Sequence, residues 1–356
     1  MSEIKVTLRK DLKKKPQDEG KLGFGQYFTD HMFLLKYEAG KGWYDAEVKP
    51  YGPFEMDPAS MVFHYGQEIF EGAKCYRRED GGLQLFRIKD NFARMSDSAE
   101  RLSMPRLDEA LCLEGLKKLL EIDKDWVPSA PGTSLYIRPT LIATEAKLGV
   151  HASHTYLFFI ILSPVGAYYA AGLKPVDIYV EDTYVRAVRG GLGEAKAGGN
   201  YAASILASET AQKKGYSQVL WLDGVEHKYV EEVGAMNIMF AYDKKLVTPA
   251  LTGGLLSGIT RRSILTLAEE MGYEVEEKRI SIEEAFRDVQ SDAIKEVFGT
   301  GTAAVVSPVG KLCWKGETVT VGDGGIGALS QKLYDTLTGI QLGKIQDTHH
   351  WIEKLS

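Results

Sequence analysis

The chain has 356 residues, of which 44% are hydrophobic and 26% charged, and its formal net charge is -6. A length above about 250 residues predicts two domains, and the slightly acidic balance argues against a nucleic-acid-binding surface. The longest apolar run, 156–162, is far shorter than the roughly 20 residues that span a bilayer. Three scattered cysteines, Cys75, Cys112 and Cys313, and an N-terminal segment without an apolar stretch predict a cytoplasmic protein outside any membrane.

Short apolar runs alternate with turns in the first half of the chain. These runs predict strands at 61–63, 73–77, 83–88, 134–143 and 156–163. Apolar residues at helical spacing predict helices near 91–102 and 111–121. We therefore expect an α+β domain with a largely antiparallel sheet, covering residues 1–165.

Glycine, tyrosine, alanine and proline are mixed in residues 166–175, and this composition predicts an interdomain connection. The following domain, 176–356, shows strand patterns at 176–180, 218–222 and 236–242 and helix patterns at 201–214 and 259–271. A capping box at 281–284 predicts one more helix. We expect a second mixed α and β domain, wound as a strained barrel.

Lys196 is bracketed by five glycines in the segment 189–201, just before a predicted helix. Glycine allows a backbone to pass close to a bulky ligand, and a lysine that attacks a carbonyl needs the lowered pKa that a desolvated pocket supplies. Local composition alone favours the simpler interpretation, a solvated lysine on a flexible loop.

Three further segments combine polar groups with a turn or a helix start. The helix predicted to begin at 259 offers the free amides of Ile259 and Thr260 to a phosphate, unless Ser257 or Thr260 merely caps it. The glycine and threonine turn at 298–304 can bind anions or serve only as a turn. Glu231 and Glu232 precede a strand, where a buried carboxylate would need a cationic partner and an exposed pair would simply be solvated.

In their order along the chain, these segments resemble one family. The motifs are GLGEAKAGGNY (191–201), EEVGAMN (231–237), LSGITR (256–261) and FGTGTA (298–303), preceded by FGQYFTDHM (24–32), FHYGQEIFEG (63–72), LYIRP (135–139) and SPVGAY (163–168). Together they resemble the fold-type IV pyridoxal-phosphate enzymes and, more narrowly, the branched-chain-amino-acid aminotransferases. The resemblance covers residues 22–340, nearly the whole chain.

The resemblance implies a small N-terminal α/β domain, a larger C-terminal pseudo-barrel domain and pyridoxal 5'-phosphate as the cofactor. Lys196 would form the Schiff base with the cofactor, and Tyr201 would hydrogen-bond the ring oxygen beside it. Glu232 would pair with the pyridine nitrogen and keep the ring protonated as an electron sink. The cofactor phosphate would be bound by Arg94, the amides of Ile259 and Thr260, and the Thr302 hydroxyl.

The implied reaction transfers the amino group of leucine, isoleucine or valine to 2-oxoglutarate by a ping-pong scheme, giving branched-chain 2-oxo acids and glutamate. Arg138 would accommodate the side-chain carboxylate of glutamate, and the substrate α-carboxylate would lie at turn amides near Ala235 and Ala303. A loop with Leu148 and Val150 would reach the pocket of a neighbouring subunit, so a homodimer is expected. The aliphatic side chain would contact a pocket lined by Phe28, Tyr65, Phe70, Tyr136 and Tyr168.

Two positions depart from patterns found in the family. Ala235 stands where many relatives have a threonine, which removes one hydroxyl contact to the substrate carboxylate. Residues 304–307 read AVVS where animal relatives carry a redox CxxC, so we expect no regulation through thiols. Alternatives within the fold are D-amino-acid aminotransferase and aminodeoxychorismate lyase, and a non-enzymatic alternative is a protein that only binds pyridoxal phosphate or phosphate.

Overall fold

The structure is a computed structural model that describes residues 3–166 and 173–355, and it divides into two compact units. Unit 1 comprises Met1–Ala170, Ala195–Gly198 and Ile340–Ser356; unit 2 comprises Ala171–Glu194 and Gly199–Gly339. Most of the predicted connection, 166–175, lies outside the described residues. The domain boundaries at 165 and 176 therefore stay a prediction.

Unit 1 contains a nine-stranded sheet in which the described neighbours are antiparallel, apart from the parallel pair β1 and β3. β4 pairs with β7 beside the main path of strands. This confirms the antiparallel sheet expected in the first half of the chain. In sheet order the strands are β1 (Lys5–Val6), β3 (Gly42–Pro50), β2 (His31–Glu38), β8 (Thr155–Val165), β7 (Ser134–Ala143), β5 (Ala73–Arg77), β6 (Leu83–Phe86) and β18 (Ile352–Leu355), with β4 at Glu68–Phe70.

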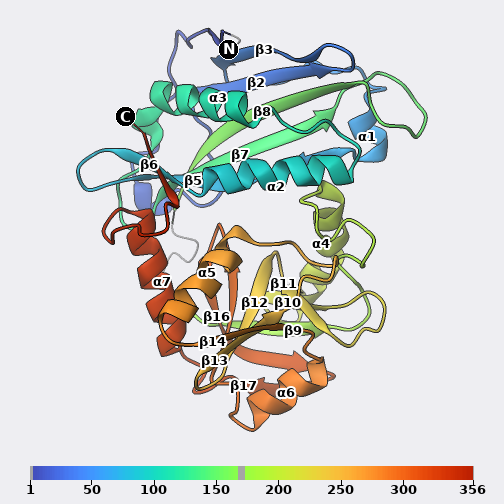
Figure 1. Ribbon diagram of the computed structural model, residues 1–356, viewed down its shortest axis with the longest axis vertical. Helices are drawn as coiled ribbons and strands as arrows, with labels where there is room; N and C mark the ends of the chain where they lie inside the picture. The colour runs from blue at the N-terminus through green and yellow to red at the C-terminus, as the bar shows by residue number, and fades with distance from the viewer. Residues whose placement is uncertain (1–2, 167–172, 356) are drawn as a thin grey trace. The chain divides into compact units, whose positions relative to one another are not determined.

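The helices of unit 1 pack onto this sheet: α3 against β2 and β3, and α2 against β4 and α3 (Figure 1). α3 begins where Asp108 accepts a hydrogen bond from the Leu111 amide at 3.0 Å. The core between helices and strands includes the fully buried side chains of Phe33, Met95, Leu116, Leu135 and Phe158. The helices are α1 (Met61–Tyr65), α2 (Ile88–Arg101) and α3 (Glu109–Ile122), with 3-10 turns η1 (Glu19–Lys21) and η2 (Lys124–Trp126).

One predicted strand of unit 1 is wrong, because residues 61–63 belong to the short helix α1. Gly66 ends that helix in a left-handed conformation (φ 58°), and its amide donates to the Val62 carbonyl. A helix this short contains only one apolar run. Its sequence pattern therefore cannot be distinguished from that of a short strand. The strand predicted at 83–88 is also too long: it stops at Phe86, and α2 starts at Ile88.

Unit 2 contains a second sheet, in which β11 pairs with both β10 and β12. The strands β11, β10, β9, β16, β15 and β12 thereby close into a six-stranded barrel, as expected for the second half of the chain. The strands are β9 (Val176–Glu181), β10 (Gln218–Leu222), β11 (Val230–Val233), β12 (Met236–Ala241), β13 (Lys245–Pro249), β14 (Glu274–Lys278), β15 (Glu296–Gly301), β16 (Val305–Trp314) and β17 (Glu317–Thr320).

Four helices belong wholly or mainly to unit 2, and the predicted helices are among them. In α6, the Ser281 hydroxyl accepts a hydrogen bond from the Glu284 amide at 3.0 Å, as the capping box predicts. Within the described part of the chain, no helix combines the length and hydropathy needed to cross a bilayer. The helices are α4 (Gly198–Lys213), α5 (Ile259–Glu270), α6 (Ile282–Gln290) and α7 (Ala328–Gln341).

Candidate active site

Lys196 belongs to unit 1 and is held there through its main chain. Its amide donates to the Ser98 hydroxyl of α2 at 3.0 Å, and its carbonyl accepts from the Phe70 amide of β4 at 3.1 Å. Ala197 continues this contact in a bridge with Ile69. The Lys196 amino group lies 4.9 Å from the centre of the Phe70 ring. Lys196 is thus a fixed residue rather than a lysine on a solvated loop.

Arg94 lies one helical turn before Ser98 on the same face of α2, and its partner is Glu71. Its Nε and Nη2 atoms donate to the two carboxylate oxygens at 2.7 and 2.9 Å. Asn91 donates to the same carboxylate at 2.8 Å. Burial alone would raise the pKa of Glu71, but Arg94, with smaller contributions from Lys196 and Asn91, holds it below its ordinary value. The pair is a charged contact that orients Arg94.

Four of the predicted substrate and cofactor residues are neighbours in unit 1. The Arg138 guanidinium lies 4.6 Å from the centre of the Phe70 ring and donates to the Tyr136 hydroxyl at 3.2 Å. Phe70 is also the ring beside Lys196. The Lys196 amine, the Arg138 guanidinium and two aromatic rings thus lie together beside β4 and β7.

The remaining predicted substrate residues of unit 1 occupy other places. The Phe28 ring stacks on Tyr51 with centroids 5.2 Å apart. The Tyr65 hydroxyl accepts the Gly149 amide at 2.7 Å, in the loop that carries the exposed Leu148 and Val150. Tyr168 lies outside the described residues.

Glu232 on β11 is buried in unit 2 and faces a cation, Arg186, across 3.1 Å. Its other carboxylate oxygen accepts the Leu256 amide at 2.9 Å. Arg186 is also buried and donates to the Gly254 carbonyl at 2.8 Å. An ionised carboxylate is therefore stabilised in the interior of unit 2 by a charge and a backbone donor.

The first turn of α5 lies close to Glu232 because Asn237 contacts both. Asn237 pairs with Glu232 across the β11–β12 hairpin, and its side chain donates to the Leu256 carbonyl at 2.9 Å. Gly258 is the N-cap residue, and a Cβ atom there would collide with the Asn237 side chain. Gly258 has no side chain with which to cap this helix, and helix-start amides such as those of Ile259 and Thr260 suit an anion.

Two turns lie at the same end of the unit 2 sheet. Asn237, at the start of β12, pairs with Thr300, near the end of antiparallel β15. The β11–β12 turn with Ala235 and the β15–β16 turn with Thr302 and Ala303 are therefore neighbours, although Ala235 and Thr302 are 67 positions apart in sequence. The first turn depends on Gly234, which has a φ of 57°. Their amides lie in one region of unit 2, and the binding of a substrate carboxylate there stays a prediction.

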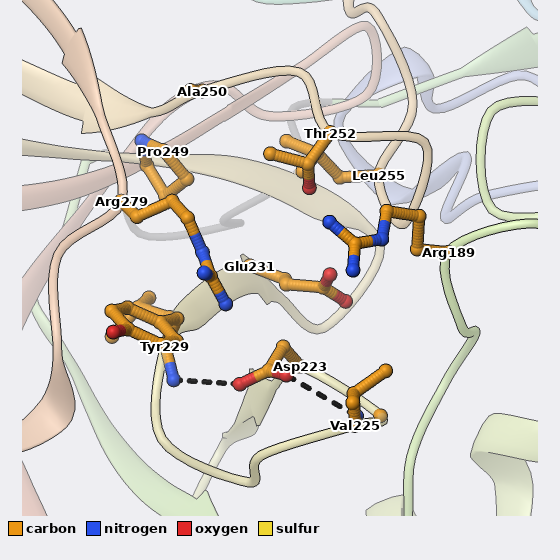
Figure 2. Close-up of a pocket in the computed structure, with 12 residues that line it drawn as sticks. Arg189, Asp223, Val225, Tyr229, Glu231, Pro249, Ala250, Thr252, Leu255 and Arg279 are labelled. Atoms are coloured by element: carbon orange, nitrogen blue, oxygen red, sulfur yellow. Dashed lines mark hydrogen bonds between the residues drawn. The ribbon is translucent and has the colours of Figure 1, made fainter.

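Glu231 precedes Glu232 on β11, and its side chain points into a small cavity of unit 2 (Figure 2). The cavity volume is about 20 Å³, which suffices for one water molecule. Figure 2 shows the Glu231 carboxylate between the guanidinium groups of Arg279 and Arg189. Its Oε2 atom has no hydrogen-bond partner among the described residues. Burial raises the pKa of Glu231 to about 7, although Arg186 acts in the opposite direction.

Sequence reasoning missed several of these groups. Glu71 was inside a quoted motif, but its pairing with Arg94 was not predicted; Arg186 and Ser98 carried no signal at all. Thr300, whose buried hydroxyl has no partner within the described chain, was also missed. Tyr201 lies on the first turns of α4 and is half-buried.

Residues 68–312 match the family model described as amino-transferase class IV, and the chain belongs to that family. It is 58% identical over 340 residues to branched-chain-amino-acid transaminase 1 of Bacillus subtilis, covering 95% of each chain. It is 54% identical over 353 residues to branched-chain-amino-acid aminotransferase 2 of the same organism, covering 99% of this chain and 97% of the relative.

A solved structure resembles this fold over nearly its whole length. It is the branched-chain amino acid aminotransferase of Escherichia coli, with a TM-score of 0.76 at 28% identity, covering 92% of this chain and 99% of that chain. The likeness confirms a fold-type IV architecture for the chain. A further similar structure is a branched-chain amino acid aminotransferase complexed with N-(5'-phosphopyridoxyl)-L-glutamate, with a TM-score of 0.74 at 27% identity, covering 90% of this chain and 98% of that chain.

Proposed function

We propose that the chain transfers the amino group of leucine, isoleucine or valine to 2-oxoglutarate, with pyridoxal 5'-phosphate as cofactor. The observation that carries the proposal is the fixed lysine: the Lys196 main chain is bonded to α2 and β4, and its amine lies on the Phe70 ring. The relatives over the full chain length support the reaction and the cofactor.

The polar groups fit a phosphorylated pyridine in their chemistry. The first turn of α5 with Ile259 and Thr260, the Thr302 hydroxyl and Arg94 suit a phosphate. Glu232, which is paired with Arg186, suits a protonated ring nitrogen. The Tyr201 hydroxyl would donate to the ring oxygen. The bound cofactor supplies the electron sink that makes the substrate α-proton removable.

Lys196 would perform the proton transfer. Its Nζ atom would accept the substrate α-proton as a general base and deliver it again as a general acid, so that the amine ends in its starting protonation state. The hydrogen bonds with Ser98 and Phe70 hold its main chain in place, so only the flexible side chain has to move.

The substrate preference rests on the aromatic side chains and Arg138. Rings such as those of Phe70 and Tyr136 favour an aliphatic substrate, since each buried methylene contributes about 0.8 kcal/mol. Phe28, Tyr65 and Tyr168 would complete the pocket. The Arg138 guanidinium, held by Tyr136, would bind the side-chain carboxylate of glutamate. The turn amides near Ala235 and Ala303 would bind the α-carboxylate.

The proposed assembly is a homodimer in the cytoplasm. Leu148 and Val150 are 64% and 89% exposed, and two apolar side chains at one loop tip favour contact with another chain. The three cysteines are free and buried, which suits a reducing compartment. Sedimentation velocity at several concentrations would establish the dimer; a monomer at working concentration would contradict it.

Substitution of Lys196 tests the central assignment. Lys196→Ala should abolish turnover, a loss of at least about 1,000-fold, together with the visible absorption of the lysine-bound cofactor. Lys332→Ala, at an exposed lysine of α7, is the matched control and should change neither. A Lys196→Ala protein that keeps both absorption and turnover would refute the role of Lys196.

The absorption spectrum also separates the alternatives. L-Leucine should convert the cofactor to pyridoxamine phosphate, and 2-oxoglutarate should restore the original spectrum. Conversion by D-leucine but not by L-leucine would indicate a D-amino-acid aminotransferase, and an unchanged spectrum would indicate a protein that only binds the cofactor. Rates with the three branched 2-oxo acids, measured with glutamate as donor, would then rank the substrates.

A further inference from the structure

Two histidines and one glutamate meet in the connection between β7 and β8 of unit 1. The ligand-type atoms of Glu145, His151 and His154 all lie within 4.8 Å of one another. The Oε2 atom of Glu145 is the common neighbour: it is 3.5 Å from the His151 Nε2 atom and 2.9 Å from the His154 Nδ1 atom. The cluster takes no part in the proposed transamination.

The hydrogen bonds of His151 fix which ring nitrogen carries its proton. The Nδ1 atom lies 2.9 Å from the Gly149 carbonyl, which can only accept, so Nδ1 carries the hydrogen. In the neutral ring, Nε2 then presents a lone pair. This atom is buried, has no hydrogen-bond partner among the described residues, and faces the Glu145 carboxylate. Two acceptors that face each other in this way are stabilised by a proton on Nε2 or by a metal ion between them.

The arrangement also matches a metal site in its spacing. Tetrahedral ligands about 2.0 Å from zinc are roughly 3.3 Å apart, and the two distances to Glu145 Oε2, 2.9 and 3.5 Å, lie on either side of that value. His154 is exposed, so its ring proton can move to Nε2 and leave Nδ1 as a ligand. A Nδ1–H bond to a backbone carbonyl, as in His151, is the usual support of a ligating imidazole.

Several hydrogen bonds hold the backbone around the cluster. The Glu145 carbonyl accepts the amides of Met61 and Lys147 at 3.0 and 3.1 Å, and its Oε2 atom accepts the His154 amide at 2.8 Å. The Gly149 amide donates to the Tyr65 hydroxyl at 2.7 Å. Gly149 is thus contacted by Tyr65 at its amide and by His151 at its carbonyl.

We propose that Glu145, His151 and His154 form a binding site for a divalent transition-metal ion, with zinc as the fitting ion and water as the fourth ligand. Imidazole and carboxylate ligands suit zinc better than the hard cations magnesium and calcium, which prefer oxygen ligands throughout. The bound ion ties both ends of the loop 145–154 together. It thereby restrains Leu148 and Val150, the exposed tip of that loop.

Calorimetric titration of the holoenzyme with zinc chloride in phosphate-free buffer tests the site. Wild type should bind one zinc per chain with a dissociation constant of about 10 µM or below, and His151→Ala and Glu145→Gln should each weaken binding about tenfold or more. His350→Asn is the control at another exposed histidine; asparagine tolerates its φ of 58° and should leave binding unchanged. The buried cysteines should not compete while the protein is folded.

Hydrogen exchange of the wild-type protein gives a readout that does not depend on any variant folding. Zinc should slow exchange of the amides between 146 and 153 relative to zinc-free protein, and magnesium at equal concentration should not. The proposal is overturned if wild type binds no zinc below about 100 µM. It is equally overturned if binding survives in His151→Ala, or if the protected amides lie elsewhere.

Discussion

Glu71 and Arg94 illustrate how one buried charge depends on another. The Glu71 side chain has no exposure, and both of its oxygens accept hydrogen bonds from the Arg94 guanidinium. Removing only one member of a buried pair is costly, since the remaining charge keeps its desolvation penalty without the compensating attraction. If the Glu71 charge is removed, the Arg94 guanidinium remains mostly buried without its ion-pair partner.

Glu71→Gln should therefore lower the free energy of unfolding of the apoprotein by about 3 kcal/mol. The pKa of Glu71 is held below its ordinary value near 4.5, so this stabilisation is complete above pH 4.5 and is lost as the pH falls further. Urea denaturation at pH 7 and pH 4 would show a difference between the two proteins that shrinks at the lower pH.

Glu79→Gln provides the comparison at an exposed ion pair, that of Glu79 with Lys344. It should change the free energy of unfolding by less than about 0.5 kcal/mol. If Glu71→Gln is no less stable at pH 7 than this control, the pair with Arg94 contributes nothing measurable.

Glu231 should affect stability in the opposite direction. Burial raises its folded pKa to about 7, so the folded state holds a proton that the unfolded chain has released. The contribution is then most favourable at acid pH and is lost as the pH rises from about 4.5 to about 7. Since a pKa difference of one corresponds to about 1.4 kcal/mol, the stability of Glu231→Gln relative to wild type should increase by roughly 3 kcal/mol between pH 4.5 and pH 8.

Thermal unfolding of the two proteins across this pH range measures the gain. The comparison cancels groups that titrate alike in both proteins. A constant difference between wild type and Glu231→Gln, independent of pH, would show that folding does not raise the pKa of Glu231.

Single residues with a family motif could be predicted from the sequence, whereas their partners could not. Lys196 and Glu232 stand in ordered motifs, and the family resemblance assigns Arg94. Their contacts with Ser98, Glu71 and Arg186 join residues 98, 23 and 46 positions apart. Such pairings depend on how strands and helices pack, and no local pattern encodes them.

At the scale of elements, the start of α5 depends on the absence of one side chain. A Cβ atom at Gly258 would collide with Asn237, whose amide group holds the Leu256 carbonyl. Gly258→Ala should displace Asn237 and with it the first turn of α5. The affinity for pyridoxal phosphate, measured by titration of the apoprotein, should fall about tenfold.

Gly52→Ala is the appropriate control, because a Cβ atom there meets no other atom within 4 Å and the residue has no positive φ. It should leave cofactor affinity unchanged. Equal affinities for the two variants would mean that the amides of Ile259 and Thr260 do not bind the phosphate.

Element prediction worked best for long patterns and failed for a short one. The strands at 134–143 and 218–222 have the predicted bounds, and α6 follows its capping box. Residues 61–63 show why α1 was missed: three apolar residues fit a strand, and the decisive feature is the left-handed Gly66 that ends the helix. Barrel closure through β11 and β12 is a long-range property that the predicted strands only suggested.

For the molecule as a whole, the three cysteine thiols should be unreactive in the folded protein. Burial raises the pKa of Cys75 to about 12 and that of Cys112 well above its ordinary value, and Cys313 is also buried. Because the thiolate is the reactive form, activity should survive mild peroxide, and the native protein should react with fewer than one equivalent of thiol reagent. A loss of activity that dithiothreitol reverses would contradict this prediction.

The segment Ala195–Gly198 belongs to unit 1, although the residues on both sides of it belong to unit 2. No single cut in the polypeptide can therefore yield two intact halves. A fragment of residues 171–339 would carry the lysine but lose the Ser98 and Phe70 contacts that fix it, whereas residues 1–170 would keep those two residues without the lysine. When this protein is fused, split or recombined, these four residues must therefore stay with unit 1, which holds them in the fold. They should not be moved with unit 2, which surrounds them in the sequence.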